Sequence, residues 1–294
     1  MSRCHIRPGV WFVSPALAAI LLFFALPVAA SLVLSLTDFD IYAIGDAANL
    51  RFVGLANYAQ LLREPLFWTA LANTAYFVAV AGPLSIALSL AAALAVGSRL
   101  ARCRGLFRTL LFLPVATTLV AVAVVWRFLY HPRVGLLNGA LAALGIAPVD
   151  WLGDPHFAMP ALILMAVWKN FGFNMVIFLA GMQTIPERLY EAARIDGAGA
   201  AAQLRRITLP ALAPTFLFVG VSTGIGYLQL FAEPYVMTAG GPSDRTLSIV
   251  LLMYREGFRW WNMGYAAAVA FVLFAIILAA SWLPWRLRAR EAGA

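Results

Sequence analysis

Six long apolar runs, four of them free of charged residues, constrain this chain more than any other feature. A helix needs about 20 residues to cross about 30 Å of hydrocarbon, and its backbone groups must be satisfied internally. Only 12% of the residues are charged, whereas soluble domains have about 25%. The sequence therefore predicts an all-α polytopic membrane protein with six transmembrane helices.

The predicted spans divide the chain into three parts. We expect the spans over residues 11–36, 70–96, 110–130, 157–182, 211–232 and 263–285. The first run is too long for the core of a signal peptide, so it is interpreted as an uncleaved span. It belongs to an N-terminal part, residues 1–68. The predicted transmembrane core is 69–285, with a polar loop at 186–210, and 286–294 form a basic tail.

The connections between the spans carry basic residues unevenly. One face would hold 13 basic residues and four acids: Arg3, Arg7, Arg99, Arg102, Arg104, Arg108, Arg188, Arg194, Arg205, Arg206, Arg286, Arg288 and Arg290, with Glu187, Glu191, Asp196 and Glu291. The other face has six basic residues outside the spans and nine acids. Because basic loops stay in the cytoplasm, both termini and the 186–210 loop are expected there. The basic residues form no continuous patch, which argues against nucleic acid as a partner.

The outer connections are expected to contain structure of their own. The stretch FVGLANYAQLLREPLFW in 38–68 predicts a short amphipathic helix at the membrane interface. Residues 131–156 are rich in Gly and Pro. Trp260 and Trp261 are expected at the headgroup level.

The most polar internal segment lies between the fourth and fifth runs. Thr184 and Glu187 fit a capping box, with Pro186 in the first turn. A helix is predicted through Ile195, and Gly197 is the residue type that ends helices in a left-handed conformation. A second helical piece is expected to about residue 206, and Pro210 starts the next apolar run. Two short helices in a membrane loop favour a docking element over a solvated loop.

No motif for catalysis is present. The chain lacks G-x-x-x-x-G-K-[ST], G-x-S-x-G and H-E-x-x-H, and its one lysine follows no glycine-rich loop. The three histidines lie at a terminus or in loops, and no metal-ligand spacing occurs. We expect no catalytic residue, no metal and no ATP bound by this chain.

Two charges fall inside predicted spans, where a charge is costly and often functional. Arg127 lies near the outer end of the third span, and either extends to the surface or faces a polar path. Lys169 lies nearer mid-span. It either pairs with a neighbouring subunit or lines a cavity.

Uncharged polar residues gather in the fourth and fifth spans. Asn170 and Asn174 share one helix face at i, i+4 spacing, and so do Thr223 and Tyr227. Amides and hydroxyls beside aromatic rings suit a carbohydrate, but the same residues can hydrogen-bond helix to helix. The candidate solute path comprises Asn170, Phe173, Asn174, Thr223, Tyr227 and Gln229.

The spacing of the polar loop resembles the EAA loop of binding-protein-dependent ABC importer permeases. Glu191-Ala192-Ala193 is followed after three residues by Gly197 and after nine more by Ile207, and Leu209-Pro210 comes one residue later. Further stretches resemble the carbohydrate-uptake branch, in particular the larger maltose-type permease: WRFLYHPRVGLLNGAL, WLGDP, AVWKNFGFNM, LAGMQTIPERLYEAARIDGA, RRITLPALAPT and YVMTAGGP, with Thr246 after it. The resemblance covers about residues 53–285.

The resemblance implies a type I (MetI-like) importer fold, with spans two to six as the core and an extra N-terminal span. It implies a heterodimer with a second permease, two ATPase subunits that bind ATP and Mg²⁺, and an extracytoplasmic solute-binding protein, in a bacterial inner membrane. The coupling residues would be Glu191, Ala192, Ala193, Gly197, Ile207, Leu209 and Pro210. Thr223 and Tyr227 resemble in placement positions that line the sugar site, but the residue types differ. The long outer insertion of the maltose-type relative is absent here.

The resulting hypothesis is a permease subunit that forms, with its sibling, the path for a sugar or sugar-like solute. Alternating access would follow from movement of the coupling helix. The alternative is a membrane scaffold that binds a cytoplasmic partner through the same loop without transport. The sequence leaves the identity of the solute undetermined.

Overall fold

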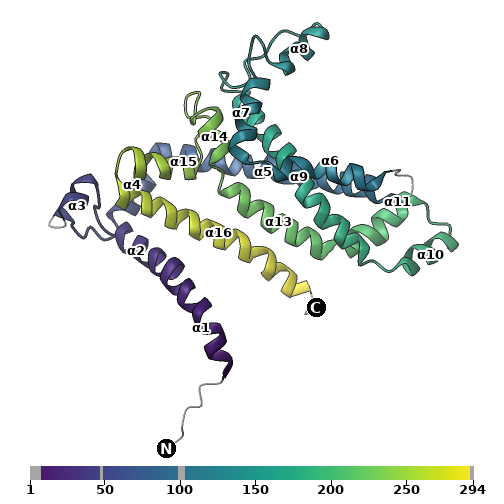
Figure 1. The fold of residues 1–294 in the computed structure, drawn as a ribbon, viewed down its shortest axis with the longest axis horizontal. Helices are drawn as coiled ribbons and strands as arrows, with labels where there is room; N and C mark the ends of the chain where they lie inside the picture. Colours follow the sequence, from purple (N-terminus) through teal and green to yellow (C-terminus); the bar gives the residue numbers. More distant parts are fainter. Residues whose placement is uncertain (1–7, 47–48, 99–102, 292–294) are drawn as a thin grey trace, which may run out of the picture. The chain divides into compact units, whose positions relative to one another are not determined.

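The computed structural model describes residues 8–46, 49–98 and 103–291 (Figure 1). Regular structure in these ranges is helical, apart from one isolated bridge between Thr37 and Phe52. The helices long and apolar enough to cross a membrane are Phe12–Ser35, Pro65–Gly97, Ala158–Gln183, Ala213–Met237 and Met263–Trp282. They correspond to five of the six predicted spans. Arg3, Arg7, Arg99 and Arg102 of the orientation argument lie outside the described residues.

The predicted third span, 110–130, is not one continuous helix. It is the end of α6 (Arg104–Ala116) followed by α7 (Leu119–Leu129), and the two are bent by 97°. Pro114 lacks an N–H for the helix ladder, and the Thr117 hydroxyl donates to the Pro114 carbonyl at 2.6 Å. Thr117 and Thr118 are both extended, so the chain leaves the helix there. The described residues contain six candidate spans if this bent pair counts as one.

The chain divides into two compact units. The first comprises Met1–Phe67 and Leu252–Phe274, with α1 (Pro8–Ile20), η1 (Leu21–Ala25), α2 (Leu26–Ser35), α3 (Ile41–Gly45), α4 (Ala56–Arg63), η4 (Arg255–Arg259) and the start of α16 (Met263–Glu291). The predicted amphipathic helix in 38–68 is α4. Asn57 on α4 donates to the Ser35 and Thr37 carbonyls at 2.9 and 2.8 Å, which ties α4 to the end of α2.

The second unit, Trp68–Leu251 and Ala275–Ala294, is built around α9 (Ala158–Gln183). It also holds most of α5 (Pro65–Gly97), then α6, α7, α8 (Leu136–Ala143), α13 (Ala213–Leu228), α14 (Ala232–Met237) and the start of α15 (Ile249–Tyr254). Helix α9 packs against α6, α7, α13 and α14. At its crossing with α6, a Cβ on Gly172 would overlap the Leu111 carbonyl oxygen. This position therefore requires glycine for the two backbones to approach so closely.

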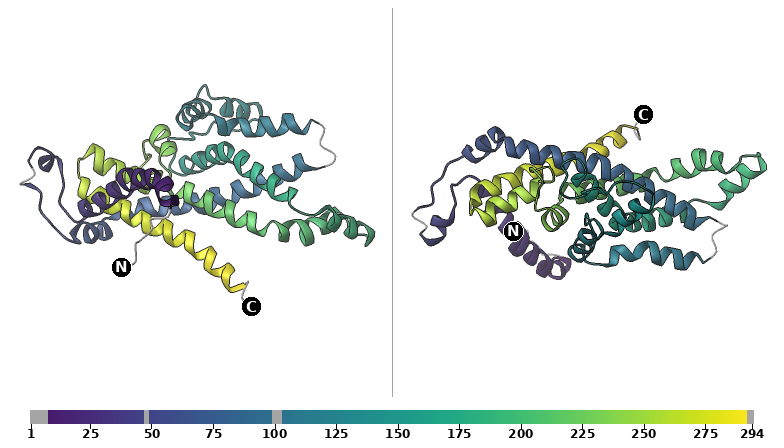
Figure 2. Two further views of the ribbon diagram at one scale, coloured as in Figure 1. Left: turned by 60° about the horizontal axis from the view of Figure 1, so that its bottom comes forward. Right: turned by 90° about the horizontal axis from the view of Figure 1, so that it is seen from above.

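The polar loop forms a helical hairpin of α10 (Glu187–Ile195), α11 (Ala200–Gln203), η3 (Leu204–Thr208) and α12 (Leu209–Ala211). It projects beyond the ends of the neighbouring helices of its unit (Figure 2). The hydroxyls of Tyr190 and Thr208 hydrogen-bond at 2.9 Å across the hairpin. The Gln203 amide donates to the Ala198 carbonyl at 2.7 Å. These contacts give the loop a defined shape.

Two details of the predicted loop are wrong. Thr184 does not cap α10, because it ends α9 and its hydroxyl donates to the Gly181 carbonyl. Glu187 pairs instead with Arg194 at 3.1 Å. The second helical piece also does not stop near residue 206. A π-helical turn precedes Pro210, in which the Leu209 N–H bonds to the Leu204 carbonyl, and the helix continues to Ala211.

The Gly- and Pro-rich connection between α7 and α9 folds around one buried amide. Asn138 on α8 donates to the Pro132 and Val149 carbonyls, and its Oδ1 accepts from the Val149 N–H and the Trp151 indole. The motif stretches LLNGAL and WLGDP therefore meet at Asn138. A Cβ on Gly135 would overlap backbone atoms of Leu129 and His131.

Candidate functional site

All six residues of the candidate solute path line one pocket of about 420 Å³ in the second unit. Its walls come from α9, from α13 and the turn after it, and from Val115 and Leu119 on either side of the α6–α7 bend. The remaining lining residues are Ser222, Gly226, Leu230, Phe231, Ala232 and Glu233. The bend that sequence reasoning missed thus forms part of the wall.

Helix α9 presents its amides to this pocket on one face. The Asn174 side chain donates to the Thr223 hydroxyl of α13 at 2.9 Å and is buried. Asn170, one turn earlier, is half-buried, and Phe173 is exposed between them. Asn174 and Thr223 therefore have two roles, because they join α9 to α13 and also line the pocket.

Tyr227 contributes a buried hydroxyl to the pocket wall. Its Oη is buried, as is the Ser85 hydroxyl, and the side chains that act on it belong to Ser85 and Asn170. The ring is held edge-on against Phe77, with centroids 5.3 Å apart. Tyr227 therefore links the pocket wall to Ser85 on α5 and to Asn170 on α9.

Glu233 is the lining residue that sequence reasoning missed. It lies in the first turn of α14 and is only 6% exposed. The sequence placed it at the start of an outer connection, because the apolar run ends at Ala232. The signal that existed was Pro234, since proline favours the first turn of a new helix.

Lys169 lies behind the pocket wall and bonds within its own chain. Its ammonium donates to the Val115 carbonyl at 3.1 Å, at the end of α6. The last carbonyls of a helix lack intrahelical partners and carry partial negative charge, so a cation is favourable there. The Glu233 carboxylate is the opposite charge that acts on this ammonium. Lys169 thereby connects α9 to the bend and to α14.

Arg127 is exposed and does not line the pocket. Its guanidinium donates to the Val236 carbonyl of α14 at 3.2 Å. This position fits an arginine that reaches the surface.

The predicted coupling residues divide between exposed and packed positions. Glu191, Ala192, Gly197 and Pro210 are exposed, and Ala193, Ile207 and Leu209 are half-buried. Gly197 has φ +76°. The Ala198 N–H bonds to the Ala193 carbonyl and the Gly197 N–H to the Arg194 carbonyl, the two bonds of a Schellman cap. The predicted left-handed helix end at Gly197 is confirmed.

The chemistry available in the pocket is hydrogen bonding and aromatic contact. Amides, hydroxyls and one carboxylate surround the space, and Phe173 and Phe231 offer ring faces. Among the described residues there is no group of three or more His, Cys, Asp or Glu side chains arranged to hold a metal ion.

Comparison with known proteins finds matches over nearly the whole chain. The family model described as "Binding-protein-dependent transport system inner membrane component" matches residues 85–290. The lactose transport system permease protein LacF of Rhizobium radiobacter is 38% identical over 288 residues, which are 96% of this chain and 94% of that protein. The trehalose/maltose transport system permease protein MalF of Thermococcus litoralis is 36% identical over 273 residues, 92% of this chain and 90% of that one.

A solved structure has the same fold. It is a bacterial alginate ABC transporter in complex with a periplasmic protein carrying an alginate pentasaccharide. One of its chains superposes with a TM-score of 0.80 at 22% identity, covering 96% of each chain.

Proposed function

Because this chain belongs to the family of binding-protein-dependent transport system inner membrane components, and is thus a multi-pass permease subunit, we propose that it carries a neutral carbohydrate through its polar pocket. The observation that carries the proposal is the convergence of Asn170, Phe173, Asn174, Thr223, Tyr227 and Gln229 on one pocket. Amides and hydroxyls match the hydroxyl groups of a sugar. The relatives named for lactose and for trehalose/maltose support a neutral oligosaccharide as the solute.

The proposed assembly contains this chain, a second permease, two ATPase subunits and an extracytoplasmic binding protein. ATP and Mg²⁺ would bind to the ATPase subunits. The hairpin of α10 to α12 would dock on one of them, which requires a cytoplasmic loop and cytoplasmic termini. Its projecting position and its internal hydrogen bonds support this role, because a rigid element transmits movement better than a solvated loop.

The first experiment isolates the tagged chain from its own membranes in mild detergent and identifies its partners by mass spectrometry. We expect an ATPase subunit and a second permease. The isolated complex is then placed in proteoliposomes with its binding protein and ATP, and accumulation of lactose, maltose and trehalose is measured. A chain that purifies without an ATPase, even after crosslinking at Glu191, would favour the scaffold alternative.

The pocket itself is tested by Asn170→Leu, which removes a hydrogen-bonding amide at similar size. Uptake should fall at least tenfold while the complex still assembles. Arg127→Gln is the matched control outside the pocket and should leave uptake within about twofold. Equal uptake by both variants would show that the solute path lies outside this pocket.

A further inference from the structure

A second and larger cleft, of about 840 Å³, lies at the far end of α9 from the Gly- and Pro-rich connection. Its walls are the last turns of α5 and α9, the first turns of α6, and the hairpin segments α10, α11 and η3. None of the residues assigned to the solute pocket lines it. The proposed function leaves this cleft without a role.

The cleft carries a net positive charge. Among the described residues, Arg104, Arg108 and Arg194 line it against one acid, Glu187, so three positive charges and one negative leave +2. Glu187 is already paired with Arg194. Arg104 and Arg108 are one helical turn apart on α6. Arg104 donates one N–H to the Ser98 carbonyl at 2.8 Å, which leaves most of its donors for another group.

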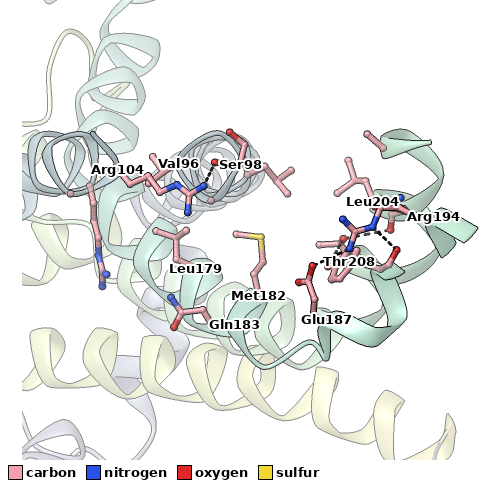
Figure 3. A pocket seen from close by; sticks show the side chains of 17 residues that line it. Val96, Ser98, Arg104, Leu179, Met182, Gln183, Glu187, Arg194, Leu204 and Thr208 are labelled. Carbon is pink, nitrogen blue, oxygen red and sulfur yellow. Dashed lines mark hydrogen bonds and ion pairs between the residues drawn. The ribbon is translucent and has the colours of Figure 1, made fainter. Parts of the chain in front are cut away.

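The floor between the charged walls is apolar. Figure 3 shows Leu179 and Met182 between Arg104 on one side and Arg194 on the other. Leu94, Val96 and Leu204 are further apolar lining residues, and Gln183 and Gln203 are polar ones. Val96, Leu179 and Met182 belong to the last turns of two membrane-spanning helices, Pro65–Gly97 and Ala158–Gln183. Val96 and Leu179 are buried in the core of the second unit, so guanidiniums and packed apolar side chains meet at the ends of these two helices.

From this arrangement we propose that the cleft binds the headgroup of an acidic phospholipid. Arginine forms paired hydrogen bonds with phosphate oxygens. Basic pockets between transmembrane helices on the cytoplasmic side suit anionic headgroups. The phosphate lies against Arg104 and Arg108, beside the ends of the two transmembrane helices. Placement in the inner leaflet rests on the cytoplasmic orientation of the hairpin proposed above.

The bound lipid fills the space between the hairpin and the ends of α5 and α9. It thus supports the hairpin from the membrane side.

The test measures phosphatidylglycerol retained by the purified complex. The complex is reconstituted in nanodiscs of equal parts phosphatidylglycerol and phosphatidylcholine, extracted, washed free of bulk lipid and analysed by native mass spectrometry. We expect wild type to keep phosphatidylglycerol in preference to phosphatidylcholine. Arg104→Gln/Arg108→Gln should lower this retention at least fivefold, and Arg104→Lys/Arg108→Lys should keep most of it.

The matched control is Arg205→Gln/Arg206→Gln, which removes two exposed charges from η3 of the hairpin, outside the cleft lining. It should retain lipid as wild type does. Equal losses in both double variants would mean general attraction of basic residues to the membrane and would overturn the proposal. So would a wild-type complex without retained phosphatidylglycerol, or displacement of that lipid by millimolar inorganic phosphate, which would indicate a site for a free anion.

If Arg104→Gln/Arg108→Gln does not assemble, Arg108→Gln alone is compared with Arg205→Gln in the same assay. The readout is lipid and not uptake. A failed lipid test would therefore leave the transport proposal standing, and a failed uptake test would leave the lipid site to be judged by its own data.

Discussion

At the scale of single residues, the buried charges depend on one another. Lys169 is 6% exposed, and so is Glu233. Each ion loses hydration on burial, and that cost is offset only by hydrogen bonds and opposite charge. The Val115 carbonyl and the nearby carboxylate provide both for Lys169. We therefore expect Lys169 and Glu233 to have a joint structural role at the wall of the pocket.

Removing one partner should harm the protein more than removing both. Lys169→Met is expected to lower the melting midpoint of the purified complex by several degrees, because it leaves the Glu233 carboxylate buried without its opposite charge. Lys169→Met/Glu233→Gln should recover part of that loss. The midpoint is measured by tryptophan fluorescence in detergent, with Arg127→Met as an exposed control. Glu233→Gln alone is measured as the second single variant, and a double-variant loss equal to the sum of the two single losses would show that the charges are independent.

A substitution at Gly197 tests the effect of backbone conformation without adding a steric clash. A Cβ at this position meets no atom within 4 Å, so the structure leaves room for a side chain. A left-handed conformation nonetheless costs most residues about 1–2 kcal/mol and is tolerated best by Gly and Asn. Gly197→Ala should therefore lower binding-protein-stimulated ATPase activity, and Gly197→Asn should retain more of it. If the two variants were equally active, the conformation of the helix end would not matter for coupling.

At the scale of elements, α9 organises the second unit because it is buried on most sides. About two-thirds of its most apolar window, 67%, is buried, compared with 33% for the Pro65–Gly97 span and 22% for Ala213–Met237. The same helix supplies Asn170 and Asn174 to the pocket, and its last turns supply Leu179 and Met182 to the basic cleft. A shift of α9 would therefore displace lining residues of both sites. The close α6–α9 crossing at Gly172 holds α9 in position.

The crossing is tested by Gly172→Ala. The added methyl group would overlap the Leu111 carbonyl, which belongs to a helix backbone and cannot turn away. Overpacking of this kind costs about 1–3 kcal/mol, so we expect a lower melting midpoint and reduced uptake. Gly220→Ala is the matched control on α13, because a Cβ there meets nothing within 4 Å. A Gly172→Ala complex as stable as the control would mean that the two helices separate easily.

At the scale of the whole molecule, the asymmetry of basic residues predicts which loops face the cytoplasm. The α10 to α12 hairpin and the α8 connection leave opposite ends of α9, since one follows its last residue and the other precedes its first. A helix that crosses the membrane places these two connections on opposite sides. The side on which the hairpin lies therefore fixes the side on which the α8 connection lies.

Cysteine labelling in intact cells checks that orientation. In a Cys4→Ser/Cys103→Ser background, Leu144→Cys should react with a membrane-impermeant maleimide, because Leu144 is 75% exposed on the outer connection. Glu191→Cys should react only after the membrane is permeabilised. Labelling of Glu191→Cys in intact cells would reverse the orientation and remove the proposed ATPase contact.

The sequence by itself determined the membrane class, the approximate spans and the position of the hairpin, since long apolar runs and a left-handed glycine depend on local composition and backbone preference. It also identified six pocket residues, because helical spacing put them on shared faces. Only the tertiary structure revealed the bend between α6 and α7, the place of Glu233 in the pocket wall and the bond from Lys169 to Val115. The last two depend on contacts between segments distant in the chain, which no local pattern encodes, whereas the bend follows from Pro114 and the extended Thr117 and Thr118. The role of Thr184 was also not predictable from the local pattern. Helix α9 extends to Gln183, so Thr184 is its C-cap residue and does not cap α10.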